Sequence, residues 1–109
     1  MGYPSDFSGV SYKSRGFSNP TLVGFMESHD KERLMYKNIT YGNSTTEYDI
    51  KNFNNSLGRM KAAAALFLTV PGPKMIWQFG ELGYEKSINT CEDGTVRSDC
   101  KLSPKTSAF

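Results

Sequence analysis

The sequence predicts an α/β chain built around a single strand–helix–strand unit, and three observations lead to that prediction. Residues 22–26 form a short apolar run that stops at polar residues, as a buried parallel strand does. Apolar residues then recur every three or four positions from residue 50 to residue 68, which is the period of a helix. Residues 74–79 form a second apolar run. This order implies two parallel strands joined by a right-handed crossover.

The predicted unit covers residues 22–83 and is flanked by a loop lead-in at 1–21 and an irregular tail at 84–109. Its helix begins after Asp49, a suitable N-cap residue, and contains four consecutive alanines of high helix propensity. A Pro-Gly-Pro turn follows the helix and ends it. Residues 31–48 are polar and rich in turn signals, so we expect a loop between the first strand and the helix.

The composition is that of a small globular domain and excludes several classes of protein. The 109 residues suffice for one small domain. Leu, Ile, Val and Phe make up 22 of them, close to the limit below which a chain buries too little apolar surface to fold. The net charge is +2 without any run of like charges, so we expect no nucleic acid and no membrane as partner. No membrane-spanning run and no signal peptide are predicted in this chain.

Two parallel strands and one helix leave much apolar surface uncovered. Parallel sheets normally carry helices on both faces, and residues 74–79 have only one predicted helix to pack against. We therefore expect the chain to be a portion of a larger fold. If it folds alone, we expect it to self-associate, because its apolar strand and open sheet edges otherwise face water.

Two sequence blocks carry the functional signal. The first, Phe-Met-Glu-Ser-His-Asp at residues 25–30, lies at the carboxyl end of the first predicted strand, where polar residues of a parallel barrel line the catalytic cleft. The second, at residues 68–83, combines a Pro-Gly turn, an apolar strand and a Gly-Glu-Leu-Gly loop. Each block alone is a weak signal, but the two in this order with a helix between them form a specific combination.

Together the two blocks resemble strands seven and eight of the catalytic barrel in the α-amylase superfamily, glycoside hydrolase family 13, and are most similar to its secreted enzymes from Bacteroidetes. The resemblance spans about residues 22–83. It implies a partial (β/α)8 TIM barrel, covering about the seventh and eighth strand and helix elements plus an irregular tail. Ser28 stands where the family usually has Asn, and Phe79 and Gly80 replace its commoner Gly-acid pair.

The resemblance assigns roles to two neighbouring residues. Asp30 matches the family's third carboxylate, a transition-state stabiliser that hydrogen-bonds sugar hydroxyls, and His29 matches a His that binds the same sugar. Members of the family are retaining glycosidases whose nucleophile and acid/base lie on earlier strands, in blocks that this chain lacks. The resemblance therefore implies a parent enzyme that acts on α-glucosidic bonds of starch-like glucans, and an isolated chain that is inactive.

Four further residues each allow two interpretations. Arg33 follows Asp30 by three positions and either reaches the cleft to bind substrate or has an ordinary surface or ion-pair role. Glu81 matches a family Glu near the end of strand eight and either binds sugar or caps a loop. Trp77 and Phe79 either stack on sugar rings or belong to the apolar core.

The chain has two cysteines, Cys91 and Cys100, separated by eight residues that include an Asp-Gly turn signal. This spacing allows a hairpin-like disulfide, worth about 2–3 kcal/mol in the loop-entropy model. Free thiols are the alternative. A zinc site is not favoured, because the chain has a single His and no Cys-x-x-Cys pair.

The resemblance also bears on cofactor, partner and location. It implies no cofactor in this segment, with calcium left open for the parent enzyme, an α-glucan oligosaccharide or polysaccharide as partner, and an extracellular or periplasmic parent. An α-glucan transferase or branching enzyme of the same superfamily shares the His-Asp pair and is the first alternative. The second, from a different class, is a standalone carbohydrate-binding or interaction domain.

Overall fold

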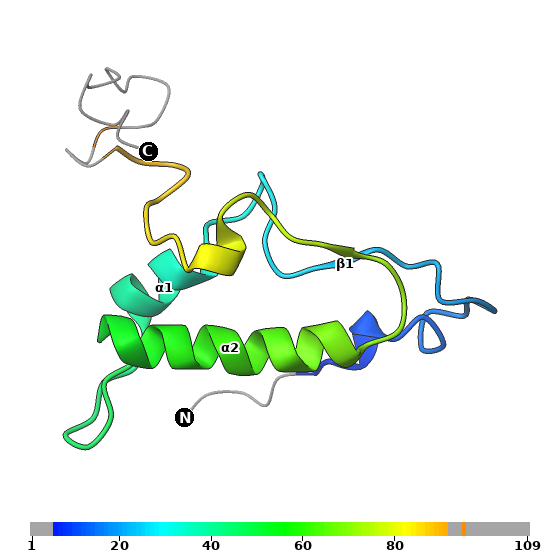
Figure 1. Ribbon diagram of the computed structural model, residues 1–109, viewed down its shortest axis with the longest axis horizontal. Coiled ribbons are helices and arrows are strands. Elements are labelled where there is room, and N and C mark those ends of the chain that lie inside the picture. The colour runs from blue at the N-terminus through cyan, green and yellow to red at the C-terminus, as the bar shows by residue number, and fades with distance from the viewer. Residues whose placement is uncertain (1–5, 92–94, 96–109) are drawn as a thin grey trace.

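The computed structural model describes residues 6–91 and residue 95 of the chain. The described residues form two helices and a pair of short strands, together with two short 3-10 helices, η1 and η2 (Figure 1). In chain order the elements are η1 (Ser8–Val10), β1 (Gly24–Phe25), α1 (Leu34–Tyr41), α2 (Phe53–Thr69), β2 (Lys74–Met75) and η2 (Gly80–Leu82).

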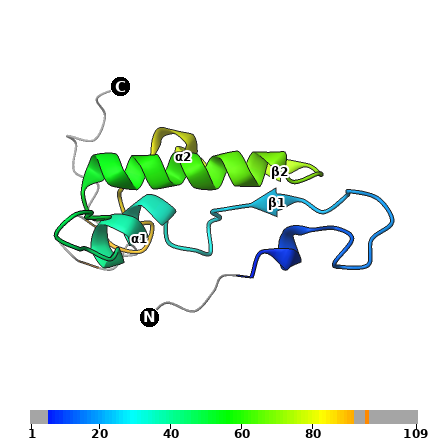
Figure 2. The ribbon, with the colours of Figure 1, turned by 90° about the horizontal axis from the view of Figure 1, so that it is seen from below.

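Strands β1 and β2 pair in parallel, with Gly24 opposite Lys74 and Phe25 opposite Met75. The long helix α2 connects them and runs alongside the pair, as both views of the ribbon show (Figures 1 and 2). Helix α2 lies close to β1, because a Cβ on Gly24 would come within 3.2 Å of the Phe67 ring of α2. The described residues therefore contain the strand–helix–strand order that the sequence predicts.

Both strands are shorter and more exposed than predicted. Only two residues of 22–26 and two of 74–79 pair, and the side chains of Phe25 and Ile76 are 52% and 56% exposed. The prediction of buried strands is therefore wrong for this chain. Its physical reason is that α2 covers one side of a two-stranded ladder, whereas a buried parallel strand needs cover on both faces.

Helix α2 begins later than predicted, and its cap differs. The side chain of Asn52 accepts hydrogen bonds from the amides of Asn54 and Asn55, so Asn52 is the N-cap in place of Asp49. The Asp49 carboxylate instead accepts from the Lys51 amide and the Ser44 hydroxyl, in the turn that precedes the helix. Asp49 and Asn52 are both residue types that cap helices, and the periodicity that predicted the helix does not distinguish between them.

Helix α1 occupies a segment predicted as loop, so that prediction is wrong for Leu34–Tyr41. Its eight residues pack against α2 and bury Met35 completely. Two turns of helix are too few for a period of 3.6 to stand out among polar neighbours. The chain leaves the helix at Gly42, where a Cβ would come within 2.3 Å of the Asn38 carbonyl oxygen.

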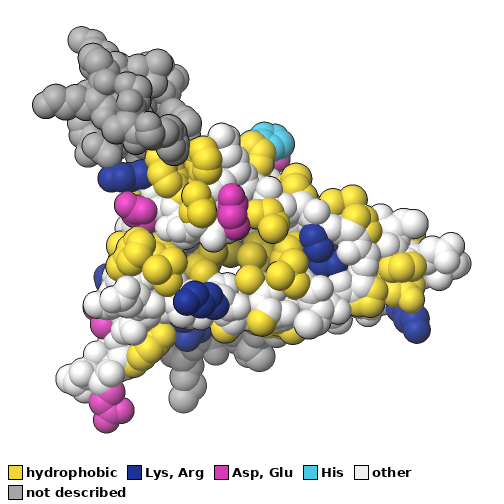
Figure 3. Space-filling view, viewed as in Figure 1, with side chains coloured by type: hydrophobic (Ala, Val, Ile, Leu, Met, Phe, Trp, Pro, Cys, Tyr) yellow, Lys and Arg dark blue, Asp and Glu magenta, His cyan; other side chains and the backbone are white. Residues whose placement is uncertain are grey.

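The core is small, and an apolar groove lies beside it. Among the described residues only Met35 and Met60 are buried hydrophobic side chains. A groove of about 260 Å³ separates α2 from β2 and η2, and the face shown in Figure 3 gathers hydrophobic side chains around this hollow. Its apolar lining includes Leu57, Phe67 and Trp77. No helix within the described part of the chain is long and apolar enough to cross a membrane.

Replacing the observed cap tests the helix boundary. In Asn52→Ala the first turn of α2 loses its side-chain acceptor, so the free energy of unfolding should fall by about 1 kcal/mol. Asn54→Ala, an exposed change on the same turn, should leave stability nearly unchanged. Urea denaturation followed by circular dichroism measures both. Equal effects of the two substitutions would contradict the assignment of Asn52 as the cap.

The uncovered apolar surface predicts self-association of the isolated chain. Phe25 of β1 and Ile76, which follows β2, are more than half exposed, and the groove beside α2 is lined mainly by apolar side chains. Light scattering should therefore show a mean mass that rises with concentration. A monomer at every concentration would contradict this prediction.

Candidate functional site

His29 and Asp30 lie next to each other in the loop that follows β1, at the carboxyl end of the parallel pair. His29 Nε2 is 3.1 Å from Asp30 Oδ1, and the two side chains are 73% and 70% exposed. The His29 ring also lies 5.9 Å from the ring of Trp77, which belongs to the segment after β2. The structure thus brings together the two residues singled out from the sequence and presents both to solvent.

Ser28 fixes the turn that carries this pair. The Ser28 hydroxyl accepts a hydrogen bond from the Asp30 amide at 3.3 Å, and the Ser28 carbonyl accepts one from the Lys31 amide at 3.3 Å. Ser28 is only 6% exposed. Asn makes the same kind of turn with its side-chain oxygen, and Ser does so through its hydroxyl. Ser28 can therefore form the tight turn before Asp30 that an Asn would form.

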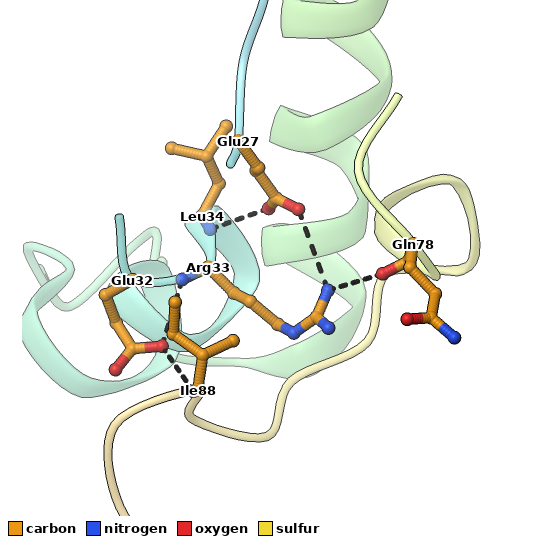
Figure 4. Close-up of polar contacts among 6 residues, drawn as sticks. All are labelled: Glu27, Glu32, Arg33, Leu34, Gln78 and Ile88. Carbon is orange, nitrogen blue, oxygen red and sulfur yellow. Dashed lines mark hydrogen bonds and ion pairs between the residues drawn. The ribbon is translucent and has the colours of Figure 1, made fainter. Parts of the chain in front are cut away.

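Arg33 lies in the interior, away from solvent. It is 6% exposed, and its Nη1 donates a hydrogen bond to the Gln78 carbonyl oxygen at 2.7 Å (Figure 4). The same nitrogen lies 3.9 Å from Glu27 Oε2, and the guanidinium sits over the Tyr84 ring at 4.9 Å. The structure buries Arg33 between two loops and pairs it with Glu27, in agreement with the ion-pair interpretation, and its role in binding substrate stays a prediction.

Glu27 is a functional candidate that the sequence reasoning missed. It is 5% exposed, and its Oε1 accepts a hydrogen bond from the Leu34 amide at 2.7 Å, which caps the first turn of α1. Its Oε2 faces Arg33 and accepts no hydrogen bond from the described residues. A cap supplied from seven residues upstream matches no local helix-start pattern, so only the folded chain reveals it.

Glu32 holds the segment 87–89 against the start of α1. Its carboxylate accepts hydrogen bonds from the Ser87 hydroxyl at 2.6 Å, the Ile88 amide at 2.9 Å and the Asn89 side chain at 3.1 Å. Partial burial raises the pKa of Glu32, but these hydrogen bonds and one from the Arg33 amide outweigh it, so the pKa lies below its ordinary value.

Glu81 occupies a different position from the His29–Asp30 pair. It lies exposed in η2 and lines the apolar groove together with Lys61, whereas His29 and Asp30 are not part of the groove lining. The alternative sugar-binding and loop-capping roles of Glu81 both remain predictions. Of the two aromatic candidates, Phe79 contacts Tyr84 and Trp77 contacts His29.

Cysteine and metal chemistry add little to this site. Cys91 is disulfide-bonded, and Cys100, the other cysteine of the chain, lies outside the described residues, so the Cys91–Cys100 pair stays a prediction. Within residues 6–91 and 95, no three His, Cys, Asp or Glu side chains gather in a way that could hold a metal ion.

Comparison with known proteins identifies no relative. Neither a protein-family model nor a curated protein matches this sequence. The functional assignment therefore depends on the residues and on their geometry. That geometry offers an exposed carboxylate beside an imidazole, which together can accept and donate hydrogen bonds to the hydroxyl groups of a ligand.

Lowering the pH should release the segment that Glu32 holds. Because the pKa of Glu32 is lower in the folded than in the unfolded chain, its contribution to stability is present above the ordinary glutamate pKa and is lost as the pH falls through the folded value. The protection of the Ile88 amide, measured by NMR as its exchange rate relative to that of an unstructured amide at the same pH, should fall over that acidic range. In Glu32→Ala the exchange should be fast at neutral pH as well. Slow exchange in that variant would contradict the role of Glu32.

Proposed function

We propose that this chain is a portion of an α-amylase-type glycoside hydrolase and supplies its transition-state-stabilising His29–Asp30 pair. The observation that carries the proposal is the exposed pair at the carboxyl end of β1, in a parallel strand–helix–strand unit. In a (β/α)8 barrel the catalytic residues lie at this end of the strands. We propose this family because of the two sequence blocks at residues 25–30 and 68–83. The parallel pairing of β1 with β2 supports the proposal.

The chemistry expected of the pair follows from its groups. The Asp30 carboxylate would accept hydrogen bonds from two sugar hydroxyls, and its negative charge would stabilise the positive charge that develops on the sugar ring during glycosidic cleavage. The His29 imidazole would donate a further hydrogen bond to the same sugar. Such contacts accelerate the reaction because they strengthen in the transition state.

The bond-making residues would come from the rest of the barrel. Retaining glycosidases need two carboxyl groups about 5 Å apart, and Asp30 is a third group with a separate role. We therefore expect the isolated chain to be inactive toward starch-like glucans, and the full-length enzyme to act outside the cytoplasm. Any calcium would be bound by other parts of that enzyme. The same pair would serve a transferase or branching enzyme of the superfamily.

Substitution of Asp30 tests the proposal in the full-length protein encoded by the reading frame that contains this chain. Asp30→Asn keeps the shape of the side chain and removes its charge, so kcat on soluble starch should fall by about 100-fold or more. Glu47→Gln removes a carboxylate from an exposed position in the same chain and should leave kcat unchanged. Equal activity of both variants would contradict the role of Asp30.

Calorimetry separates the proposal from a standalone binding domain. The isolated chain presents only part of a sugar site, so titration with maltooligosaccharides should give no heat of binding up to low millimolar concentrations. Micromolar binding that is lost in Asp30→Asn would favour the carbohydrate-binding domain over the enzyme fragment.

A further inference from the structure

Two loops at the carboxyl ends of the strands are connected by one buried ion pair. Glu27 and Arg33 flank the turn that carries His29 and Asp30, and both are more than nine-tenths buried. Arg33 Nη1 donates to the Gln78 carbonyl oxygen, which belongs to the loop after β2. Figure 4 shows the guanidinium between Glu27 on one side and Gln78 on the other.

The loop after β2 fits closely around the Glu27 carboxylate. A Cβ on Gly80 would lie 2.8 Å from Glu27 Oε2, nearer than side-chain carbon atoms approach an oxygen, so an alanine there would push the carboxylate away. Gly80 is not among the positive-φ glycines, so this substitution would act through space and not through backbone strain. Glu27 thus contacts the second loop directly, in addition to holding Arg33.

The segment between these contacts is strained. Phe79 has φ of 65° and ψ of 6°, the left-handed conformation that side chains other than glycine rarely adopt. Its two neighbours are Gln78, which accepts from Arg33, and Gly80, which borders Glu27. Such strain persists only where surrounding contacts determine the backbone, and the ion pair supplies contacts on both sides of Phe79.

We propose that Glu27 and Arg33 are positioning residues that set the loop after β2 against the turn carrying His29 and Asp30. Trp77, next to Gln78, is the group whose placement they determine, and its ring lies 5.9 Å from that of His29. The importance of this placement for sugar binding rests on the proposed function. The coupling between the two loops does not, because it follows from the contacts alone.

The chain contains its own reporter for this coupling. It has one tryptophan and one histidine, and these two side chains are neighbours. Ring protons of two side chains this close give a nuclear Overhauser effect in an NMR spectrum. We therefore expect cross-peaks between the ring protons of His29 and Trp77 in the 109-residue chain. His29→Gln should remove them, which confirms their assignment.

Two variants disturb the ion pair in different ways. Glu27→Gln keeps an oxygen to cap Leu34 and removes the negative charge that faces Arg33. Gly80→Ala keeps every charge and introduces the methyl group that collides with Glu27 Oε2. Gly58→Ala is the matched control, because a Cβ there meets nothing within 4 Å on an exposed face of α2. Far-UV circular dichroism reports whether each variant folds.

Both ion-pair variants should lose most of the intensity of these cross-peaks, and Gly58→Ala should retain it. Cross-peaks of full intensity in a folded Glu27→Gln or Gly80→Ala would overturn the proposal. Their absence from the unsubstituted folded chain would also overturn it, because the two rings would then not be neighbours. The readout involves neither sugar nor catalysis, so its failure would leave the role of Asp30 untouched, and inactivity of the full-length protein would leave the coupling untouched.

Discussion

The buried pair of Glu27 and Arg33 is the interaction on which the arrangement of the candidate site depends. The two strands pair over only two residues each, so the ladder by itself restrains the loops that follow it weakly. Removing one member of a buried ion pair costs about 3–5 kcal/mol, because the other charge is left without compensation. That is a large share of the free energy of unfolding of a small protein, which is roughly 5–15 kcal/mol.

This arrangement explains how a mostly exposed pair can be held in a defined geometry. His29 and Asp30 contact solvent on most of their surface, but the residues on either side of them are buried and hydrogen-bonded. The Ser28 hydroxyl holds the turn by accepting from the Asp30 amide. Glu27 connects the two ends of this loop, because its carboxylate accepts from the Leu34 amide at the start of α1. Buried contacts that hold an accessible pair in place favour binding, because the conformational entropy of these side chains is lost during folding and not during binding.

The sequence was informative where the signal is local or periodic. The order of strand, helix and strand follows from short apolar runs and a helical period, and the position of His29 and Asp30 after β1 follows from that order. The Pro-Gly-Pro turn predicted the end of α2 for the same kind of reason.

The parts that the sequence did not reveal depend on contacts between distant residues. Helix α1 is stabilised by burial of Met35 against α2 and by the carboxylate of Glu27, and neither appears in a short window of sequence. The environment of Arg33 depends on Gln78, which is 45 positions away, so its burial could not be read from its neighbours. Phe25 is exposed because the described residues form a sheet of only two short strands.

If this chain belongs to a larger barrel that carries the bond-breaking residues, the coding DNA on its 5′ side will show it most directly. We expect an in-frame extension containing an Arg-x-Asp strand block followed by a strand block with a Glu. A start codon and a stop codon that enclose only these 109 residues would contradict it. The His29–Asp30 pair would then have to act in a binding role.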